Sequence, residues 1–390
     1  MSSKYTAAII GCGSIGNHHI AGYQLVDNID VVAVVDPLIE AREQYMEDYD
    51  IPQGYATVEE MLEKAQPDIV SVCTWHRLHP APTIAAAQAG VKGVICEKPM
   101  AISTGEANRM VDASAASGTK LVISHQRRFT PGWEKARELI AQKVIGDPIW
   151  VNCNVPEGLL NCGTHAIDGS RFVLGDPQAL WVMGAVERRT DRHERDTPIE
   201  DSCMGLVHMK DGLQLFVQSD LYRENASAGR FLIRGTEGML DVSEARVRLF
   251  STTSGGWQPV QLDVEEGEIR AIGGQTNAAQ VRELLTWIEG GPEHRGSGHK
   301  ARATVEIMMA LYESARRHHV IHLPLQEADY PLELMIVDGQ LPVEEPGCYD
   351  IRGFLKREDV DEDAYKRLRT QGMGHAQIMR KLHSDSGENR

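Results

Sequence analysis

A short apolar segment that runs directly into a glycine-rich hexapeptide is the feature that most constrains this fold. Ala7-Ala8-Ile9-Ile10 is followed by Gly11-Cys12-Gly13-Ser14-Ile15-Gly16, which matches the pattern G-x-G-x-x-G. In a strand–turn–helix unit the first glycine allows the tight turn, the second lets the backbone approach a pyrophosphate, and the third lets the helix pack closely. The amides at the helix N-terminus then face the phosphates. The sequence therefore predicts a dinucleotide-binding unit.

An acidic residue after the second apolar segment supports this prediction. Val31–Val35 ends at Asp36, at about the 20 to 25 residues beyond the glycines where a carboxylate holds the adenosine ribose hydroxyls. Such a carboxylate repels a 2′-phosphate, and Pro37 adds no compensating charge. We therefore expect NAD rather than NADP, and we expect Arg42 to be a surface residue.

Apolar and helix-like segments alternate as far as about residue 125, which predicts a parallel sheet with helices on both faces. The expected strands lie at 7–10, 31–35, 69–73, 93–96 and 121–123, and the expected helices near 15–25, 39–49, 58–64, 80–90 and 104–117. Ligands bind such sheets outside the carboxyl ends of the strands. The residues at those ends include Thr74-Trp75-His76, Glu97-Lys98 and His125-Gln126.

The pattern changes after residue 145 to short alternating segments, which predict a mostly antiparallel sheet. The expected strands are 149–155, 180–187, 203–209, 213–221, 230–234, 239–242, 246–250 and 258–262, with helices over 164–174, about 277–289 and 300–317. The predicted fold class is α/β: an N-terminal Rossmann, doubly wound parallel sheet plus a C-terminal α+β domain with an open, mostly antiparallel sheet. We divide the chain into 1–125, 126–324 and a C-terminal extension, 325–390.

The extension is polar, with a charged helical stretch near 359–382 and apolar anchors such as Leu332 and Phe354. Order over such a length requires a docking surface. We expect the extension to pack on the second domain or across a subunit interface.

Composition excludes several classes of partner. The formal charge of −16 argues against nucleic acid and anionic membranes as partners. The N-terminus has no signal-peptide pattern, and no apolar run approaches the ~18 residues of a membrane span, so we expect a cytoplasmic protein. Seven cysteines without a C-x-x-C pair predict neither disulfides nor zinc, and Cys162 with His165 lacks a second ligand pair, so no metal is expected.

Six motifs together carry a family resemblance. They are the hexapeptide 11–16, Asp36, Thr74 with His79, Glu97-Lys98-Pro99, Arg127-Arg128-Phe129 and Gly163-Thr164-His165-Ala166-Ile167-Asp168. Over about residues 5–324 the chain resembles the glucose-fructose oxidoreductase, inositol dehydrogenase and MocA (Gfo/Idh/MocA) family. The resemblance implies a nicotinamide cofactor, oxidation or reduction of a sugar or polyol carbon, and homodimers or homotetramers that pair through the sheets.

Lys98 and His165 are the candidates for the reaction chemistry. Moving a hydride from a carbinol to nicotinamide needs a base for the hydroxyl proton and a positive or hydrogen-bonding group near the developing alkoxide. Lys98, at a strand's carboxyl end, can hold the ribose and the reacting hydroxyl, with Glu97 orienting it. His165 is the candidate acid/base because imidazole titrates near neutral pH. The alternatives are a solvated surface lysine and a structural histidine.

The other site predictions form a cofactor group and a substrate group. The predicted cofactor residues are Gly11, Gly13, Ser14, Ile15, Gly16, Asp36, Thr74, Trp75, His79, Glu97 and Lys98, and the predicted substrate residues are Asn161, Arg128, Thr164 and His125. Arg128 is weighed equally as a substrate contact and as part of an ion pair, and the ion pair is favoured for Arg127. Asp168 is expected to be structural, and Trp75 either stacks near the cofactor or packs in the core.

One residue departs from the family pattern. Where the D-x-G-x-H signature has aspartate, this chain has Asn161, which can orient a hydroxyl but cannot hold a charge. Three functions therefore compete: an NAD-dependent dehydrogenase of a sugar, polyol or sugar derivative, an NAD-dependent glycoside hydrolase that works by transient oxidation and elimination, and a non-catalytic NAD-binding regulator. Net NADH formation separates the first two, and binding without turnover identifies the third.

Overall fold

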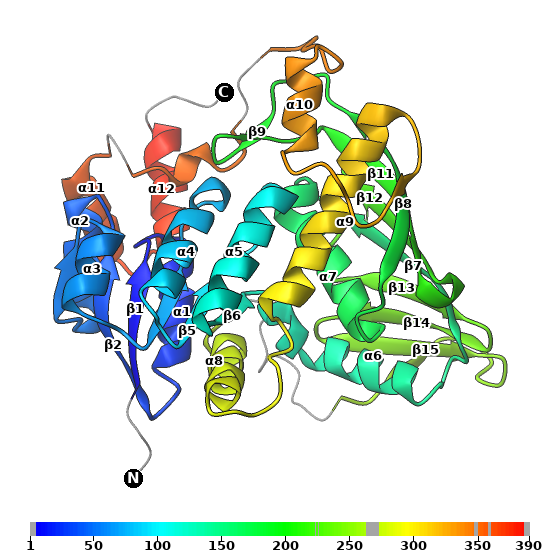
Figure 1. The fold of residues 1–390 in the computed structure, drawn as a ribbon, viewed down its shortest axis with the longest axis horizontal. Coiled ribbons are helices and arrows are strands. Elements are labelled where there is room, and N and C mark those ends of the chain that lie inside the picture. The colour runs from blue at the N-terminus through cyan, green and yellow to red at the C-terminus, as the bar shows by residue number, and fades with distance from the viewer. Residues whose placement is uncertain are drawn as a thin grey trace.

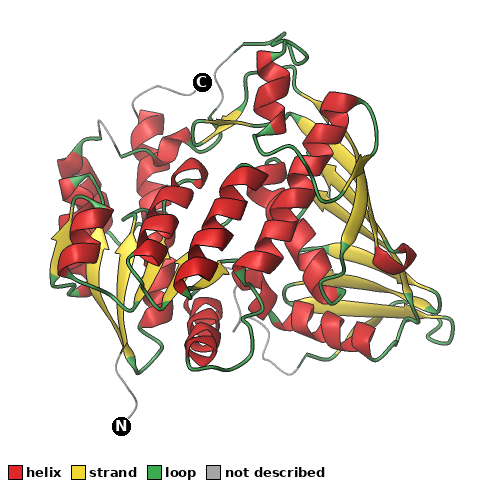
Figure 2. Ribbon diagram, viewed as in Figure 1, coloured by secondary structure: helices red, strands yellow, loops and turns green. Residues whose placement is uncertain are grey.

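Two sheets, each covered by helices, lie side by side in the computed structural model, which describes residues 5–222, 224, 226–262, 273–346, 350–357 and 360–385. The six-stranded sheet occupies the left of Figure 1 and the nine-stranded sheet the right. Figure 2 shows helices on both faces of the first sheet.

The six-stranded sheet has the order β3-β2-β1-β4-β5-β6, and every neighbouring pair is parallel. Its strands are β1 (Tyr5–Ile10), β2 (Ile29–Val35), β3 (Gln53–Tyr55), β4 (Ile69–Val72), β5 (Gly93–Cys96) and β6 (Lys120–Ile123). The helices between them are α1 (Ser14–Tyr23), α2 (Ile39–Tyr49), α3 (Val58–Lys64), α4 (Pro80–Gln88) and α5 (Thr104–Ser117). Successive residues of β1 point to opposite faces of the sheet and join two different hydrophobic clusters. Ile9 is in the cluster that includes residues of α1, and Ile10 is in the cluster that includes residues of α5. A sheet covered on both faces needs such continuously apolar strands.

The nine-stranded sheet has the order β16-β15-β14-β13-β7-β12-β11-β8-β17. Its strands are β7 (Pro148–Val155), β8 (Ala179–Glu187), β11 (Ser202–Met209), β12 (Gln214–Ser219), β13 (Phe231–Gly235), β14 (Gly238–Ser243), β15 (Arg246–Ser251), β16 (Gln258–Val260) and β17 (Ile321–His322). Only the β7–β12 pair among them is parallel, so the prediction of a mostly antiparallel sheet is confirmed. The helices α6 (Pro131–Ala141), α7 (Thr164–Val173) and α9 (Gly298–Arg317) pack against this sheet.

Helix α8 (Gly274–Ile288) returns to the first sheet although it follows the second one in sequence. It packs on α1 so closely that a Cβ added to Gly22 would lie 2.5 Å from the Asn277 Cβ. The Asn277 amide also donates to the His18 carbonyl oxygen at 3.2 Å. The two halves of the chain therefore share a packing layer.

The C-terminal extension divides between the two sheets. Helix α10 (Pro331–Val337) packs against α9, as expected for the second domain. Helices α11 (Glu362–Thr370) and α12 (His375–Asp385) instead lie beside the first sheet (Figure 1), where Arg369 pairs with Asp48 of α2 at 2.9 Å. The expectation that the extension packs on the second domain is therefore wrong for α11 and α12.

The remaining composition-based expectations concern membranes and cysteines. No helix in the described ranges combines the length and apolarity needed to cross a bilayer. Six of the seven cysteines are free thiols, and Cys348 lies outside the described residues. No cluster of three metal-ligating side chains occurs in the part of the chain that the structure describes.

Candidate active site

The three glycines of the hexapeptide meet the three requirements of a dinucleotide turn. Gly11 has φ +97°, and a Cβ there would lie 2.8 Å from the Cys73 carbonyl oxygen. A Cβ at Gly16 would lie 2.8 Å from the Gly11 carbonyl oxygen, which is the close packing of helix on turn. A Cβ at Gly13 would meet nothing within 4 Å. The open space at Gly13, next to the N-terminus of α1 at Ser14 and Ile15, fits a pyrophosphate.

Asp36 lies against this turn. Its carboxylate accepts hydrogen bonds from the backbone N–H groups of Cys12 and Leu38, both at 2.9 Å. Arg42 folds back so that its guanidinium donates to the Asp36 carbonyl oxygen at 2.5 Å. Arg42 is half-buried at the surface, where the first turn of α2 brings its guanidinium to the residue that is predicted to hold the ribose.

The loop after β4 carries two more of the predicted cofactor residues, Thr74 and Trp75. The Thr74 hydroxyl oxygen is buried and has no hydrogen-bond partner among the described residues, so a ligand can use it. The ammonium of Lys356, from the C-terminal extension, lies 5.5 Å from the centre of the Trp75 ring. Trp75 therefore lies where the extension crosses the first domain, and not in the interior of the core.

His79 holds two loops together. Its Nδ1 lies 2.8 Å from the Pro99 carbonyl oxygen and its Nε2 lies 3.0 Å from the Thr74 carbonyl oxygen. Burial lowers its pKa to about 4, so the ring is neutral. Because both ring nitrogens face backbone, we correct the predicted cofactor contact: His79 fixes the loops after β4 and β5.

Glu97 accepts a hydrogen bond from the backbone N–H of Lys98, and its charge also acts on the Lys98 ammonium. One carboxylate oxygen lies 3.0 Å from Nε2 of His19 on α1, and the other accepts from the Lys98 N–H at 3.2 Å. Burial raises the pKa of Glu97, but the His19 bond and the charges of His19 and Lys98 outweigh it and bring the pKa to about 2. Glu97 thus positions the Lys98 main chain as a buried anion.

The Lys98 ammonium reaches the second domain. It donates to the Asn161 carbonyl oxygen at 3.2 Å and lies 3.3 Å from the side-chain Oδ1 of the same residue. Asn161 belongs to a π-helical turn, Leu159–Gly163, that leads into α7, and its Nδ2 donates to Glu157 at 3.1 Å. Burial lowers the pKa of Lys98 and the charge of Arg195 acts in the same direction. A lysine of this kind can exchange a proton closer to neutral pH.

Two histidines stand near this lysine. The rings of His165 and His125 meet edge to face with centres 5.9 Å apart, and Nδ1 of His165 is buried without a partner among the described residues. Burial, then the charges of Arg127 and Lys98, holds the pKa of His165 well below its usual range. His125 lies 3.1 Å from the Thr164 hydroxyl. The His165 imidazole is therefore neutral, and its lowered pKa makes it a weaker base than a free imidazole.

Arg128 is a structural residue. Its side chain is fully buried and makes two bonds of 2.7 Å to Asp168 and one of 3.0 Å to Asp176. It also donates to the Arg295 carbonyl oxygen at 2.6 Å. We therefore correct the substrate-contact prediction for Arg128, because these acceptors occupy its guanidinium. Arg127 pairs with Glu244 at 2.8 Å, in agreement with the ion-pair interpretation.

Two acidic side chains near Lys98 are not apparent from the sequence. Glu157 is bound to Asn161, and Glu194 lies in a small hairpin of β9 (His193–Glu194) and β10 (Thr197–Pro198). The charge of Glu194 acts on the pKa of Lys98. The polar run around Glu194 resembles a solvated loop, and nothing in the spacing indicates that it folds inward.

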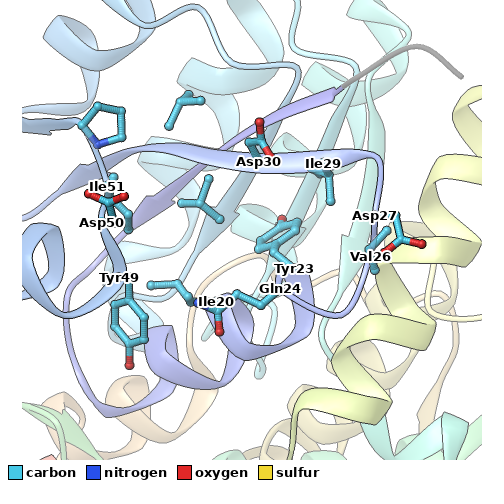
Figure 3. Close-up of a pocket in the computed structure, with 13 residues that line it drawn as sticks. Ile20, Tyr23, Gln24, Val26, Asp27, Ile29, Asp30, Tyr49, Asp50 and Ile51 are labelled. Atoms are coloured by element: carbon cyan, nitrogen blue, oxygen red, sulfur yellow. The ribbon is translucent and has the colours of Figure 1, made fainter. Parts of the chain in front are cut away.

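A pocket of about 510 Å³ lies elsewhere (Figure 3). It is lined by the end of α1 at Tyr23, the start of β2 at Ile29 and the end of α2 at Tyr49. These residues mark the amino edge of the sheet, opposite the glycine turn. None of the predicted site residues lines this pocket.

Models of one known protein family match both halves of the chain. Residues 5–125 match the GFO/IDH/MocA model described as an oxidoreductase family with an NAD-binding Rossmann fold. Residues 156–241 match the GFO/IDH/MocA C-terminal domain.

Two curated relatives and two solved structures illustrate the similarity. D-glucoside 3-dehydrogenase of Escherichia coli (strain K12) is 31% identical over 249 residues, which cover 56% of this chain and 70% of that protein. D-apiose dehydrogenase of Paraburkholderia graminis is 25% identical over 84% of this chain and 92% of its own length. Levoglucosan dehydrogenase in complex with NADH and levoglucosan superposes with a TM-score of 0.74 at 19% identity, covering 83% of this chain and 100% of that chain. An oxidoreductase from Agrobacterium radiobacter in complex with NAD⁺, L-tartaric acid and magnesium gives 0.70 at 20% identity, covering 82% and 98%.

At 19% and 20% sequence identity, the two solved structures support the fold alone. The family models and the curated relatives match this chain in its amino-acid sequence. The predicted α/β fold class is confirmed. By these matches, the chain belongs to the Gfo/Idh/MocA family of NAD-binding oxidoreductases.

Proposed function

We propose that this protein is an NAD-dependent dehydrogenase that moves a hydride between the cofactor and a hydroxyl-bearing carbon of a sugar, polyol or sugar derivative. The observation that carries the proposal is the Lys98 ammonium, which is held by Asn161 beside a neutral, partly unpartnered His165 at the carboxyl edge of the first sheet. The relatives named as glucoside and apiose dehydrogenases support the substrate class.

The predicted site residues have two kinds of role in this proposal, cofactor binding and proton transfer. In our proposal the turn 11–16, Asp36, Thr74 and Trp75 hold NAD, which supplies the hydride acceptor when bound. His165 accepts the hydroxyl proton, and Lys98 hydrogen-bonds the reacting oxygen and stabilises its developing charge. Asp36 disfavours a 2′-phosphate, so we propose NAD over NADP even though Arg42 lies close by.

The test is an incubation of the full chain and NAD with neutral sugars, polyols, sugar acids and aryl glycosides. Reduced-cofactor absorbance and aglycone release are followed together. A dehydrogenase gives stoichiometric NADH.

Lys98→Ala and His165→Ala should each lower turnover by about 10² to 10⁴ while NAD binding persists. The control Asp363→Ala, which changes an exposed side chain, should keep the turnover of the wild type. Full turnover in both variants would contradict the assigned roles, and NAD binding with no turnover on any compound would indicate a regulator.

Asn161 keeps a second function open. In the oxidation–elimination route of an NAD-dependent glycoside hydrolase, a neutral amide beside the transient ketone avoids charge repulsion with the enolate. Aglycone release with catalytic NAD and solvent deuterium in the product sugar would favour that route.

For either activity we propose that the protein forms a homo-oligomer. We also propose a cytoplasmic location, because six free cysteines suit a reducing compartment.

A further inference from the structure

Arg352 of the C-terminal extension begins a series of polar contacts that ends at the Lys98 ammonium. The Arg352 guanidinium donates to Oε2 of Glu157. The same Oε2 accepts from the Asn161 side-chain amide at 3.1 Å. The Asn161 Oδ1 in turn lies 3.3 Å from Nζ of Lys98. Three contacts therefore connect the extension to the lysine that is proposed to stabilise the reacting oxygen.

This series of contacts fixes which way the Asn161 amide points. An ammonium group requires an acceptor and a carboxylate requires a donor, so Oδ1 faces Lys98 and Nδ2 faces Glu157. The last side-chain torsion of asparagine has a broad energy profile, so the backbone alone does not select this orientation. Asn161 is only 4% exposed, and its Nδ2 therefore depends on a protein acceptor. Glu157 is that acceptor, and it keeps the amide oxygen towards Lys98.

Glu157 depends on Arg352 because its side chain has an alternative in water. The Glu157 side chain is 45% exposed, and its rotatable bonds allow it to turn outward. The Arg352 side chain is only 22% exposed, and its charge-assisted hydrogen bond opposes that turn. Loss of Arg352 should therefore release Glu157 to solvent and leave the Asn161 amide without its acceptor.

The main chain is fixed at both ends of the arginine–glutamate contact. Glu157 has φ +62°, and Asp220 accepts from the N–H groups of Glu157 at 2.9 Å and of Gly158 at 2.7 Å. The Arg352 N–H donates at 2.9 Å to Asp350, the carboxylate that also binds the β9–β10 hairpin. The two side chains therefore meet without further ordering of the backbone.

We propose that Arg352 is a positioning residue for the reaction: it holds Glu157, which orients the Asn161 amide and so keeps the Lys98 ammonium directed at the reacting oxygen. This inference rests on the proposed function and extends its machinery into the C-terminal extension. Arg352 needs no contact with the substrate or the cofactor. Its loss should lower turnover more than substrate affinity, because a misplaced group costs stabilisation of the transition state.

The test compares Arg352→Ala with the wild type as full-length protein, supplied with NAD and with D-glucose, methyl D-glucoside or myo-inositol. For a sugar that the wild type oxidises, we expect kcat to fall about tenfold while KM changes by less than about threefold. The contact uses one guanidinium nitrogen, which an ammonium can replace, so Arg352→Lys should restore kcat to within about threefold of the wild type. Arg189→Ala removes an exposed arginine contact with Glu344 of the extension. It is the matched control and should match the wild type.

A double-mutant cycle separates this series of contacts from a general loosening of the extension. Glu157→Ala should lower kcat as Arg352→Ala does, whereas Glu157→Gln, whose amide oxygen can accept both bonds, should keep kcat within about threefold. If Arg352 acts through Glu157, Arg352→Ala should cause no further loss in the Glu157→Ala protein. Additive losses, or an unchanged kcat in Arg352→Ala, would overturn the positioning role and leave the proposed function intact. If Arg352→Ala does not fold, the two Glu157 variants test the same contacts, and an unchanged kcat in Glu157→Ala overturns the inference.

The reactivity of the Lys98 amine gives a readout that needs no turnover. Loss of the Asn161 Oδ1 acceptor disfavours the ammonium form, so acetic anhydride should acetylate Lys98 about threefold faster in Arg352→Ala. The rate in Arg189→Ala should equal that of the wild type. Mass spectrometry of the peptide that contains Lys98 measures these rates. Faster acetylation without oxidation of any of the three sugars supports the series of contacts and contradicts the dehydrogenase. An unchanged acetylation rate overturns the inference.

Discussion

At the scale of single residues, the amine of Lys98 is the group on which the two halves of the molecule converge. Glu97 fixes its main chain from the first sheet, and Asn161 receives its ammonium from the second. Glu157 then holds the Asn161 amide. The orientation of this lysine therefore depends on residues from both halves, and small changes in charge around it should appear in the pH dependence of the reaction.

Asn161→Asp tests that dependence. The new carboxylate would lie where Oδ1 is now 3.3 Å from the Lys98 nitrogen, and a nearby negative charge raises the pKa of an amine or imidazole. We expect the pH profile of kcat to move to higher pH by about one unit, with alcohol oxidation kept or raised at alkaline pH. Initial rates of NADH formation between pH 6 and 10 measure this, with Asn161→Ala as the uncharged control. A shift toward acid would contradict the assigned neighbourhood of Lys98.

The sequence made part of this residue network predictable. Lys98, His165 and Asn161 stand in motifs whose spacing places them at strand ends or on the first turn of a helix. Glu157 and Glu194 stand in polar loops, where a carboxylate ordinarily faces water. The side chain of Glu157 remains 45% exposed and reaches Asn161 only four residues further along the chain, whereas Glu194 lies buried against His76, which is distant in the sequence. The contact of Arg42 with the Asp36 carbonyl oxygen was not predicted, although a side chain one turn into a helix can reach back to the strand end.

At the scale of elements, residues 350–357 of the extension act as a clasp between the two domains. Asp350 binds the β9–β10 hairpin, Lys356 pairs with Asp196 at 2.9 Å, and Arg357 donates to Gln44 of α2 at 3.2 Å. The clasp thus passes from the β9–β10 hairpin of the second domain to α2, the helix that follows Asp36.

Asp350→Ala should loosen the hairpin. The substitution removes the acceptor for three backbone N–H groups, those of Arg195, Asp196 and Arg352, and each lost bond costs about 1 kcal/mol. We expect a fall of about 1–3 kcal/mol in the free energy of unfolding and faster proteolysis within 188–198, measured by denaturant titration and limited digestion. Asp363→Ala, exposed on α11, is the control. An unchanged digestion pattern would show that the clasp does not hold the hairpin.

Element boundaries followed from periodicity where helices and strands are amphipathic or fully apolar, as in α2 and α5. The short polar β3 and the hairpin β9–β10 were not predicted, because their residues carry no apolar alternation of their own. Helix α6 was also not predicted, although Trp133, Ala136 and Leu139 are spaced along one buried face. The placement of α8 and α11 on the first sheet could not be predicted either, since it depends on complementary surfaces such as Gly22 against Asn277.

At the scale of the whole molecule, the nine-stranded sheet presents a row of exposed apolar side chains on one face in the part of the chain that the structure describes. The strand register aligns Met183 of β8 and Phe216 of β12 with Leu206 of β11 between them, and Met183 and Phe216 are 49% and 41% exposed. Exposed apolar faces of this kind mark protein–protein interfaces.

We expect a second copy of the chain to cover this face. Phe216→Asp should convert the homo-oligomer to a monomer in multi-angle light scattering, because a carboxylate in an apolar interface loses its hydration. Val337→Asp, an equivalent change on exposed α10, should leave the oligomer intact. A monomeric wild-type protein would refute the prediction.

The buried histidines should make the whole fold sensitive to mild acid. Burial lowers the pKa of His294 to about 3 and those of His79 and His125 to about 4, whereas an unfolded histidine titrates near 6.5. Since the unfolded chain binds more protons in this window, stability falls as pH drops from about 6.5 toward 4, by about 2 kcal/mol for each such histidine at pH 5.

Denaturant titrations at pH 7.5 and pH 5 measure this loss. His294 provides the sharpest variant, because its Nδ1 accepts the Gly296 N–H at 2.9 Å and protonation would break that bond. His294→Gln should therefore reduce the pH dependence between 7.5 and 5. Equal stability of the wild type at the two pH values would contradict the neutral state assigned to these rings.

The clasp also has a consequence for biosynthesis. Domains generally fold from the N-terminus as the chain leaves the ribosome, so the dinucleotide sheet can form long before residues 350–357 emerge. The hairpin that carries Glu194 receives its Asp350 support only after residue 350 has emerged. A nascent chain can therefore complete the glycine turn of the first sheet while the β9–β10 hairpin still lacks its contact with Asp350.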